Sequence, residues 1–320
     1  MLKKDIISQK PIFIVGAPRS GTTLLQFMMR SHPNISFPTG ESHFFIPLYI
    51  DRYKYGDLRK KKNVYKVLDA MYQKNPEFIE SDMHGLYFDK NLLSHELWKL
   101  KCNTIPEIIN RIYKKNAFGE GKTRWGEKTP YYILHMKTLK EMFPYALFIH
   151  IIRDGRDAAM SMIKRKKDLK IFNIYHSAKI WKQYVETGIN VGNEIGNKYY
   201  YQLRYEDLII DPKKYIKEIC NFINEPYYES VVNYQKTKNA KGKTPLLQRN
   251  IDRRNINKWK KSMTKRQITV FENIAGVTLE NCGYNLYKEN NKCKKLSFLL
   301  YRTHIKASYL WYKKMKISVT

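Results

Sequence analysis

Short apolar runs alternate along this chain with segments whose apolar residues recur at helical spacing. We interpret residues 12–15, 146–153 and 199–203 as strands, and the second run has the continuous apolar character of a buried parallel strand. Helical spacing is found in residues 64–71, 105–113, 215–222 and 268–274. The pattern predicts an α/β fold with a central parallel sheet flanked by helices.

The remaining segments suggest how the chain is organised. Residues 44–124 are rich in charged and aromatic residues, and we interpret them as helices and loops laid over the open end of the sheet. Residues 236–254 are polar and aperiodic, as expected of a loop that could fold over a ligand. We therefore expect one domain over residues 1–287, with 44–124 as an insertion and 288–320 as a basic tail.

A loop bounded by two glycines follows the first predicted strand and leads into a helix-capable stretch. Gly16 and Gly21 have the spacing of the phosphate-binding loop GxxxxGK[ST]. Thr22 occupies the place of the lysine in that motif, so a nucleoside triphosphate with magnesium fits poorly. Arg19 puts a planar, permanently charged group inside the loop, where it can grip an oxyanion with two hydrogen bonds. The loop predicts an anion site for a ligand other than ATP.

A second polar cluster follows the apolar run 146–153. Arg153 closes that predicted strand, and Ser161 and Arg165 lie four residues apart on the following helix, on one face. Open α/β sheets bind ligands at the carboxyl ends of their strands. We therefore expect this cluster and the glycine-bounded loop to lie at the same edge of the sheet.

The two blocks resemble the signatures of PAPS-dependent sulfotransferases, in the order found in that family. There the first loop holds the 5′-phosphosulfate of 3′-phosphoadenylyl sulfate (PAPS), and a strand ending in arginine, with a serine eight residues later, holds the 3′-phosphate. EKTP at residues 127–130 resembles the element that carries a lysine beside the sulfuryl group in the bacterial carbohydrate and tyrosylprotein branches. The resemblance spans roughly residues 11–287 and implies a P-loop-like fold. It implies these co-substrate-binding residues: Pro18, Arg19, Ser20, Gly21, Thr22, Thr23, Arg153, Ser161, Arg165, Tyr205, Lys258 and Trp259.

The resemblance also implies a catalytic set. Lys128 matches the lysine of EKTP and would relieve charge at the leaving phosphate, together with Arg19. Glu41 resembles the glutamate of the bacterial E-[ST]-H-F-F element, so we expect it to be the general base. His43 is the alternative base, because cytosolic sulfotransferases use a histidine. On an extended segment both side chains would lie on the same side.

The acceptor is the least specified part of the chemistry. In tyrosylprotein sulfotransferases a second glutamate follows the first, whereas Ser42 stands here, and Phe44 replaces an arginine. We therefore expect a carbohydrate or glycolipid hydroxyl as the acceptor, with a protein tyrosine or a small phenol as the alternative. The insertion 44–124 would carry the acceptor specificity.

Net charge bears on the partners. The formal net charge of +30 attracts polyanions such as a nucleotide, an acidic polysaccharide or a membrane surface, although a solvated lysine-rich surface has the same composition. The basic residues are spread over the whole chain without a recognition motif, so we expect no nucleic-acid partner. The tail 288–320 mixes lysines with apolar residues. It would form a helix that packs on the body or one that lies on an anionic membrane.

One rival enzyme class stays open, that of the P-loop nucleotide kinases. Asp154 would then be the metal-binding carboxylate, but Arg153 and Arg156 would crowd the metal.

Cysteine usage and the N-terminus indicate the compartment. The four cysteines have no metal-ligand spacing, so we expect no metal site and a reducing environment. The apolar run near the N-terminus is short and continues into the glycine-bounded loop, and a cleaved signal would destroy that loop. We therefore expect a cytoplasmic protein, with peripheral contact at the inner face of the membrane as a further option.

Overall fold

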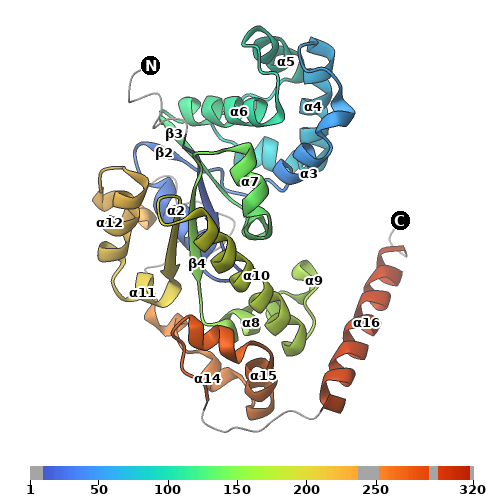
Figure 1. Cartoon of the computed structure of the whole chain (residues 1–320), viewed down its shortest axis with the longest axis vertical. Coiled ribbons are helices and arrows are strands. Elements are labelled where there is room, and N and C mark those ends of the chain that lie inside the picture. The colour runs from blue at the N-terminus through green and yellow to red at the C-terminus, as the bar shows by residue number, and fades with distance from the viewer. Residues whose placement is uncertain (1–9, 237–251, 288–294, 318–320) are drawn as a thin grey trace.

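The centre of the molecule is a five-stranded parallel sheet with the strand order β2-β3-β1-β4-β5 (Figure 1). The computed structural model describes residues 10–236, 252–287 and 295–317. The connection after β1 leads towards one edge of the sheet and that after β4 towards the other, so the carboxyl ends of β1 and β4 form a topological switch point. The strands are β1 Ile12–Val15, β2 Ile35–Ser36, β3 Arg124–Lys128, β4 Leu147–Ile152 and β5 Tyr200–Arg204.

Side chains alternate between the two faces of the sheet, and helices cover both. Phe13 and Val15 belong to the core on one face, and Ile12 and Ile14 to the core on the other. The second face packs against α2 Thr22–Arg30, α11 Tyr205–Ile210, α12 Pro212–Ile223 and α13 Glu229–Val232. The predicted α/β fold is therefore confirmed, and the three predicted strands agree with β1, β4 and β5 to within one residue at each end.

The insertion over residues 44–124 is helical as predicted, and it completes the core on one face of the sheet. Phe45 packs edge-on against Phe13 of β1, with 6.1 Å between ring centroids, and Phe13 stacks on Phe148 of β4 at 5.5 Å. The insertion also reaches the segment that carries Glu41, because Asn75 donates to the carbonyl oxygen of Glu41 at 2.9 Å. Its helices are α3 Phe45–Ile50, α4 Lys61–Lys74, α5 Lys90–Lys99 and α6 Ile105–Gly119, with α7 Met136–Met142 beside them.

A third core lies at the carboxyl end of β4, around Ile152 and Trp181. Its helices are α8 Gly155–Lys164, α9 Lys166–Leu169, α10 Ile174–Ile195, α14 Trp259–Ser262, α15 Lys265–Asn281 and α16 Lys295–Ile317. In Figure 1, α8, α14 and α15 lie at the end of the molecule opposite the insertion, α10 crosses its middle, and α16 stands along one side. Most residues of the polar segment 236–254 lie outside the described ranges.

Two strands were not predicted. β2 has only two residues, and β3 has the polar sequence RWGEK although every residue of it is buried. The first two residues of the EKTP motif, Glu127 and Lys128, are the last residues of β3. Short turns of helix complete the described chain: η1 Arg52–Tyr55, η2 Phe78–Asp82, η3 Pro130–His135, η4 Tyr234–Lys236 and η7 Arg253–Asn255.

Candidate active site

The glycine-bounded loop joins β1 to α2, and its two glycines are required by close contacts. A Cβ atom on Gly16 would lie 2.5 Å from the carbonyl oxygen of Ile151 in β4. Gly21 has φ 98° and faces the ring of Tyr205, which a Cβ atom would approach to 2.4 Å. The first turn of α2 has neither an acidic residue nor a side-chain cap within the described chain, so its backbone N–H groups suit an anion.

Arg19 lies inside this loop and connects it to the second cluster. Its backbone is in the left-handed region at φ 68°, which is uncommon outside glycine. Its Nε donates a hydrogen bond to Oγ of Ser161 at 2.9 Å, and Arg153 Nη1 donates to its carbonyl oxygen at 3.3 Å. Burial, followed by the charges of Arg165 and Arg153, lowers the pKa of Arg19. The two predicted clusters therefore meet in one positively charged site.

Two polar groups in this site lack partners among the described residues. Ser20 is completely buried and its Oγ has no hydrogen-bond partner, and the Nε of Arg153 has none either. Buried polar groups are normally satisfied, so both of these groups are available to hydrogen-bond a bound anion. The guanidinium of Arg153 also lies 4.6 Å from the ring centroid of Tyr205, the residue that begins α11 directly after β5. A hydroxyl donor and two guanidinium groups are a donor set suited to phosphate or sulfate oxygens.

Lys128, Glu41 and His43 form a chain of charged groups beside the loop. Lys128 is 3% exposed, and its Nζ lies 2.6 Å from Oε1 of Glu41. The Nε2 atom of His43 lies 3.2 Å from Oε2 of the same carboxylate. Burial alone would raise the pKa of Glu41, but Lys128 and the hydrogen bond from His43 outweigh it and lower the pKa to about 2.

The backbone around this carboxylate is not extended, contrary to the prediction. His43 has φ 56°, so side-chain alternation does not apply there. Glu41 and His43 nevertheless meet, because the chain turns at His43 before α3 begins at Phe45. A tyrosine close enough to interact with this carboxylate was not predicted: the pKa of Tyr184 is raised to about 12 by burial, then by Tyr131 and Glu41.

A buried network centred on Glu127 fixes the segment that carries Glu41, and sequence reasoning did not identify it. Oε1 of Glu127 accepts hydrogen bonds from Oγ of Ser42 at 2.9 Å and from Oγ1 of Thr129 at 2.7 Å. Its Oε2 accepts from Tyr113 of α6 at 2.8 Å, and Tyr132 lies 2.8 Å from Ser42 Oγ. The available signal was a glutamate directly before Lys128 in the EKTP motif.

Three of the remaining predicted site residues, Arg165, Lys258 and Trp259, have their partners outside the loop. Arg165 caps α8 and forms an ion pair with Asp168 at 2.8 Å, although it still affects the pKa of Arg19. Lys258 donates to Asn255, whose carbonyl oxygen accepts from Arg153 Nη2 at 2.6 Å. Trp259 is 3% exposed and packs under another arginine in the third core. Pro18, Thr22 and Thr23 lie in the loop and the first turn of α2.

The carboxylate that a kinase would use for its metal is occupied by an arginine. Asp154 accepts from Nε and Nη2 of Arg156 at 3.0 and 2.7 Å, and Arg156 is held on its other side by Glu272 at 2.7 Å. Because both carboxylate oxygens of Asp154 already accept hydrogen bonds from a cation, this residue is poorly placed to bind a metal, which argues against the kinase interpretation.

Comparisons with a family model, with curated proteins and with solved structures all find sulfotransferases. The chain matches the Sulfotransferase family over residues 11–229. It is 24% identical over 238 residues to the protein-tyrosine sulfotransferase of Drosophila melanogaster, covering 73% of this chain and 42% of that protein. It is 27% identical over 227 residues to protein-tyrosine sulfotransferase 1 of Danio rerio, covering 70% and 56%. The chain thus spans about half the length of these two relatives.

A solved structure supports the fold. The sulfotransferase domain of the Synechococcus PCC 7002 olefin synthase superposes with a TM-score of 0.59 at 23% identity, over 87% of this chain and 97% of that one. That likeness agrees with the predicted P-loop-like sheet. The match to the family covers residues 11–229, which is more than half of this chain. The chain therefore belongs to the Sulfotransferase family.

Proposed function

We propose that the protein transfers the sulfuryl group of PAPS to an acceptor hydroxyl. One observation carries the proposal: the cationic loop around Arg19 lies at the same edge of the sheet as the pair formed by the buried Lys128 and Glu41, whose Nζ–Oε1 distance is 2.6 Å. The first group suits an anionic co-substrate, and the second supplies a cation and a carboxylate for the transfer.

The residues present fit PAPS as the co-substrate. The backbone and hydroxyl groups of residues 18–23 would hold the 5′-phosphosulfate, with the unpartnered Ser20 Oγ as one donor. Arg153 and Ser161 would hold the 3′-phosphate, with Tyr205 beside them. No metal enters this account, because the fixed positive charges are supplied by arginine and lysine side chains.

The proposed reaction is a single in-line displacement. Glu41 takes the proton of the acceptor hydroxyl while the acceptor oxygen forms a bond to sulfur. The bond between sulfur and the bridging phosphate oxygen breaks, and Lys128 donates to that oxygen as adenosine 3′,5′-bisphosphate departs. Lys128 is paired with Glu41 in the structure, and its ammonium group has three N–H donors, so it can donate to the bridging oxygen while it still holds the carboxylate.

Two acceptor classes are candidates. The curated relatives named protein-tyrosine sulfotransferase favour a tyrosine hydroxyl. A carboxylate with a pKa near 2 is also a weak base, and a phenol releases its proton more readily than a sugar hydroxyl does. The carbohydrate or glycolipid acceptor stays a prediction that rests on Ser42 and Phe44.

Transfer of radiolabelled sulfate from PAPS tests both acceptor classes. Tyrosine-containing peptides and oligosaccharides are offered in parallel to the wild-type protein and to Glu41→Gln and His43→Asn. We expect label in one acceptor class, with the larger loss of rate in Glu41→Gln. Label in neither class, together with phosphate transfer from ATP and Mg²⁺, would contradict the proposal.

A further inference from the structure

The outer face of α16 exposes a group of leucines. Leu299, Leu300 and Leu310 are 55%, 60% and 69% exposed, whereas Phe298 and Tyr301 of the same helix pack against Tyr175 of α10. One side of α16 is therefore held on the body, and the other presents large apolar side chains to the surroundings. Scattered exposed leucines are ordinary, but several on one face of one helix form a patch.

Cations surround this patch, and acids are almost absent from it. No aspartate or glutamate follows Glu289 in the sequence, although lysines and an arginine are frequent there. Arg302 and Lys306 are exposed on α16 itself. Among the side chains that the structure describes on α16, the charged ones on this face are therefore positive, and they complement an anionic partner.

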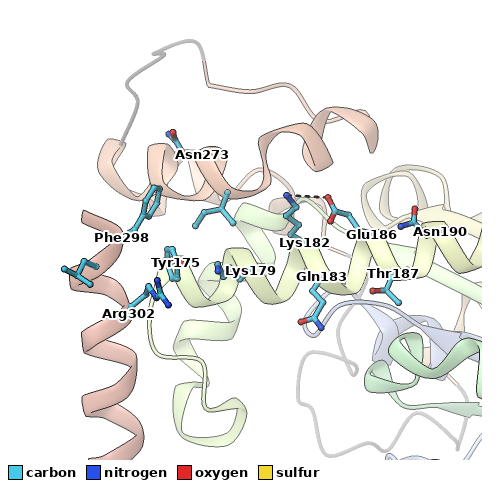
Figure 2. Close-up of a pocket in the computed structure, with 12 residues that line it drawn as sticks. Tyr175, Lys179, Lys182, Gln183, Glu186, Thr187, Asn190, Asn273, Phe298 and Arg302 are labelled. Atoms are coloured by element: carbon cyan, nitrogen blue, oxygen red, sulfur yellow. Dashed lines mark ion pairs between the residues drawn. The ribbon is translucent and has the colours of Figure 1, made fainter. Parts of the chain in front are cut away.

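A groove of about 970 Å³ continues this face between α10, α15 and α16. In Figure 2, Arg302 and Phe298 from α16 face Tyr175 and Lys179 of α10. The one acid in its lining, Glu186, lies 3.7 Å from Lys182 and accepts from Thr278 at 2.6 Å. The groove thus offers cations beside aromatic rings, a lining that suits a phosphate-bearing headgroup with an apolar neighbour.

We propose that the α16 face, defined as Leu299, Leu300, Leu310, Arg302, Lys306 and the groove beside them, docks on an anionic lipid bilayer. The leucines enter the interface and the cations contact the headgroups. Within the described ranges, no helix combines the length and the apolar character needed to span a bilayer. We place the contact at the bilayer surface, because the other side of α16 packs against α10. A soluble acidic polysaccharide would use the cations but would leave the leucines exposed.

Vesicle flotation with the full chain tests the proposal. Vesicles of phosphatidylcholine alone are compared with vesicles that also contain phosphatidylserine, at low and high salt. The apolar variant is Leu299→Ser/Leu300→Ser/Leu310→Ser, and its matched control is Leu92→Ser on α5, which is 64% exposed. The charge variant is Arg302→Gln/Lys306→Gln, with Lys62→Gln/Lys66→Gln on α4 as its control.

We expect binding only to the anionic vesicles. The apolar variant should lower the partition coefficient at least tenfold, and the charge variant by about fivefold per cation. Both controls should bind like the wild type. Failure to bind anionic vesicles, equal binding by the apolar variant, or equal inhibition of all variants by soluble heparin would overturn the proposal. Affinity for adenosine 3′,5′-bisphosphate should be unchanged in every variant, which separates this test from that of the proposed function.

Discussion

At the scale of single residues, the candidate site could be predicted where a charged side chain has a fixed place in a motif. Arg19, Ser161 and Arg153 were predicted from two separate motifs, and the structure brings them into contact. Their roles in binding stay predictions. The network around Glu127 could not be predicted, because its partners Ser42 and Tyr113, and Tyr132 which contacts Ser42, come from separate segments and meet only in the folded core.

Replacement of Lys128 tests the coupling between the cation and the carboxylate. In Lys128→Met the pKa of Glu41 should rise from about 2 towards or above its ordinary value. Burial raises this pKa, and His43 would remain to lower it. Sulfuryl transfer should fall by about 100- to 1000-fold. The pKa is followed by the carboxyl carbon chemical shift during acid titration. An unchanged pKa would show that Lys128 is not its main electrostatic partner.

Replacement of Arg19 tests the anion site. Loss of a charge-assisted hydrogen bond from Arg19→Ala should weaken the binding of adenosine 3′,5′-bisphosphate by about 10- to 100-fold. Arg165→Ala should have a smaller effect, since Arg165 pairs with Asp168 at 2.8 Å. Arg266→Ala, an exposed arginine on α15, is the control and should bind normally. Calorimetry provides the affinities, and equal affinity of Arg19→Ala and wild type would remove Arg19 from the site.

A buried carboxyl near Arg153 gives a pH-dependent prediction. Burial raises the pKa of Asp157 to about 6, so its contribution to stability is present in acid and is lost as the pH rises through 6. Asp157→Asn does not titrate. Its free energy of unfolding should therefore increase relative to wild type between pH 4 and pH 7.5, by at most about 3 kcal/mol. Urea unfolding at several pH values measures this, and a pH-independent difference would contradict it.

At the scale of elements, apolar strands and periodic helices were predicted, whereas β3 was not. Its sequence RWGEK reads as a surface segment, yet each polar side chain is buried with a partner. Arg124 donates to the carbonyl oxygen of Ile223 at 2.6 Å and pairs with Glu225 at 3.2 Å. Because these partners are nearly 100 residues away in the sequence, local hydropathy could not reveal the strand.

The start of α6 gives a prediction about stability that does not involve the candidate active site. Thr104 and Glu107 form a capping box there, in which the Thr104 hydroxyl accepts from the Glu107 N–H. Thr104→Ala should lower the free energy of unfolding by about 1 kcal/mol and leave nucleotide affinity unchanged. Thr123→Ala, in an exposed position outside any helix cap, is the control for urea unfolding. A loss of nucleotide affinity in Thr104→Ala would show that α6 influences the site.

At the scale of the whole molecule, the candidate active site lies at the carboxyl ends of the strands, and the α16 face is a second surface on the side of the body. The carboxyl ends of β1, β3 and β4 carry the proposed catalytic and co-substrate groups, while α16 lies along one side of the body (Figure 1). The net charge of +30 attracts anions to both surfaces, and salt screens this attraction. Salt should therefore weaken the binding of nucleotides and of anionic vesicles. Only vesicle binding should respond to the leucines of α16. The cytoplasmic location stays a prediction.

The most direct test of the central claim is calorimetric titration with adenosine 3′,5′-bisphosphate, with ATP–Mg²⁺ and adenosine 5′-phosphate run in parallel. The proposed site predicts tight binding that needs the 3′-phosphate and persists in a metal chelator. Arg153→Ala should abolish most of the preference for the 3′-phosphate. Preferential binding of ATP–Mg²⁺, or equal binding of the nucleotides with and without the 3′-phosphate, would contradict the assignment of PAPS to this site.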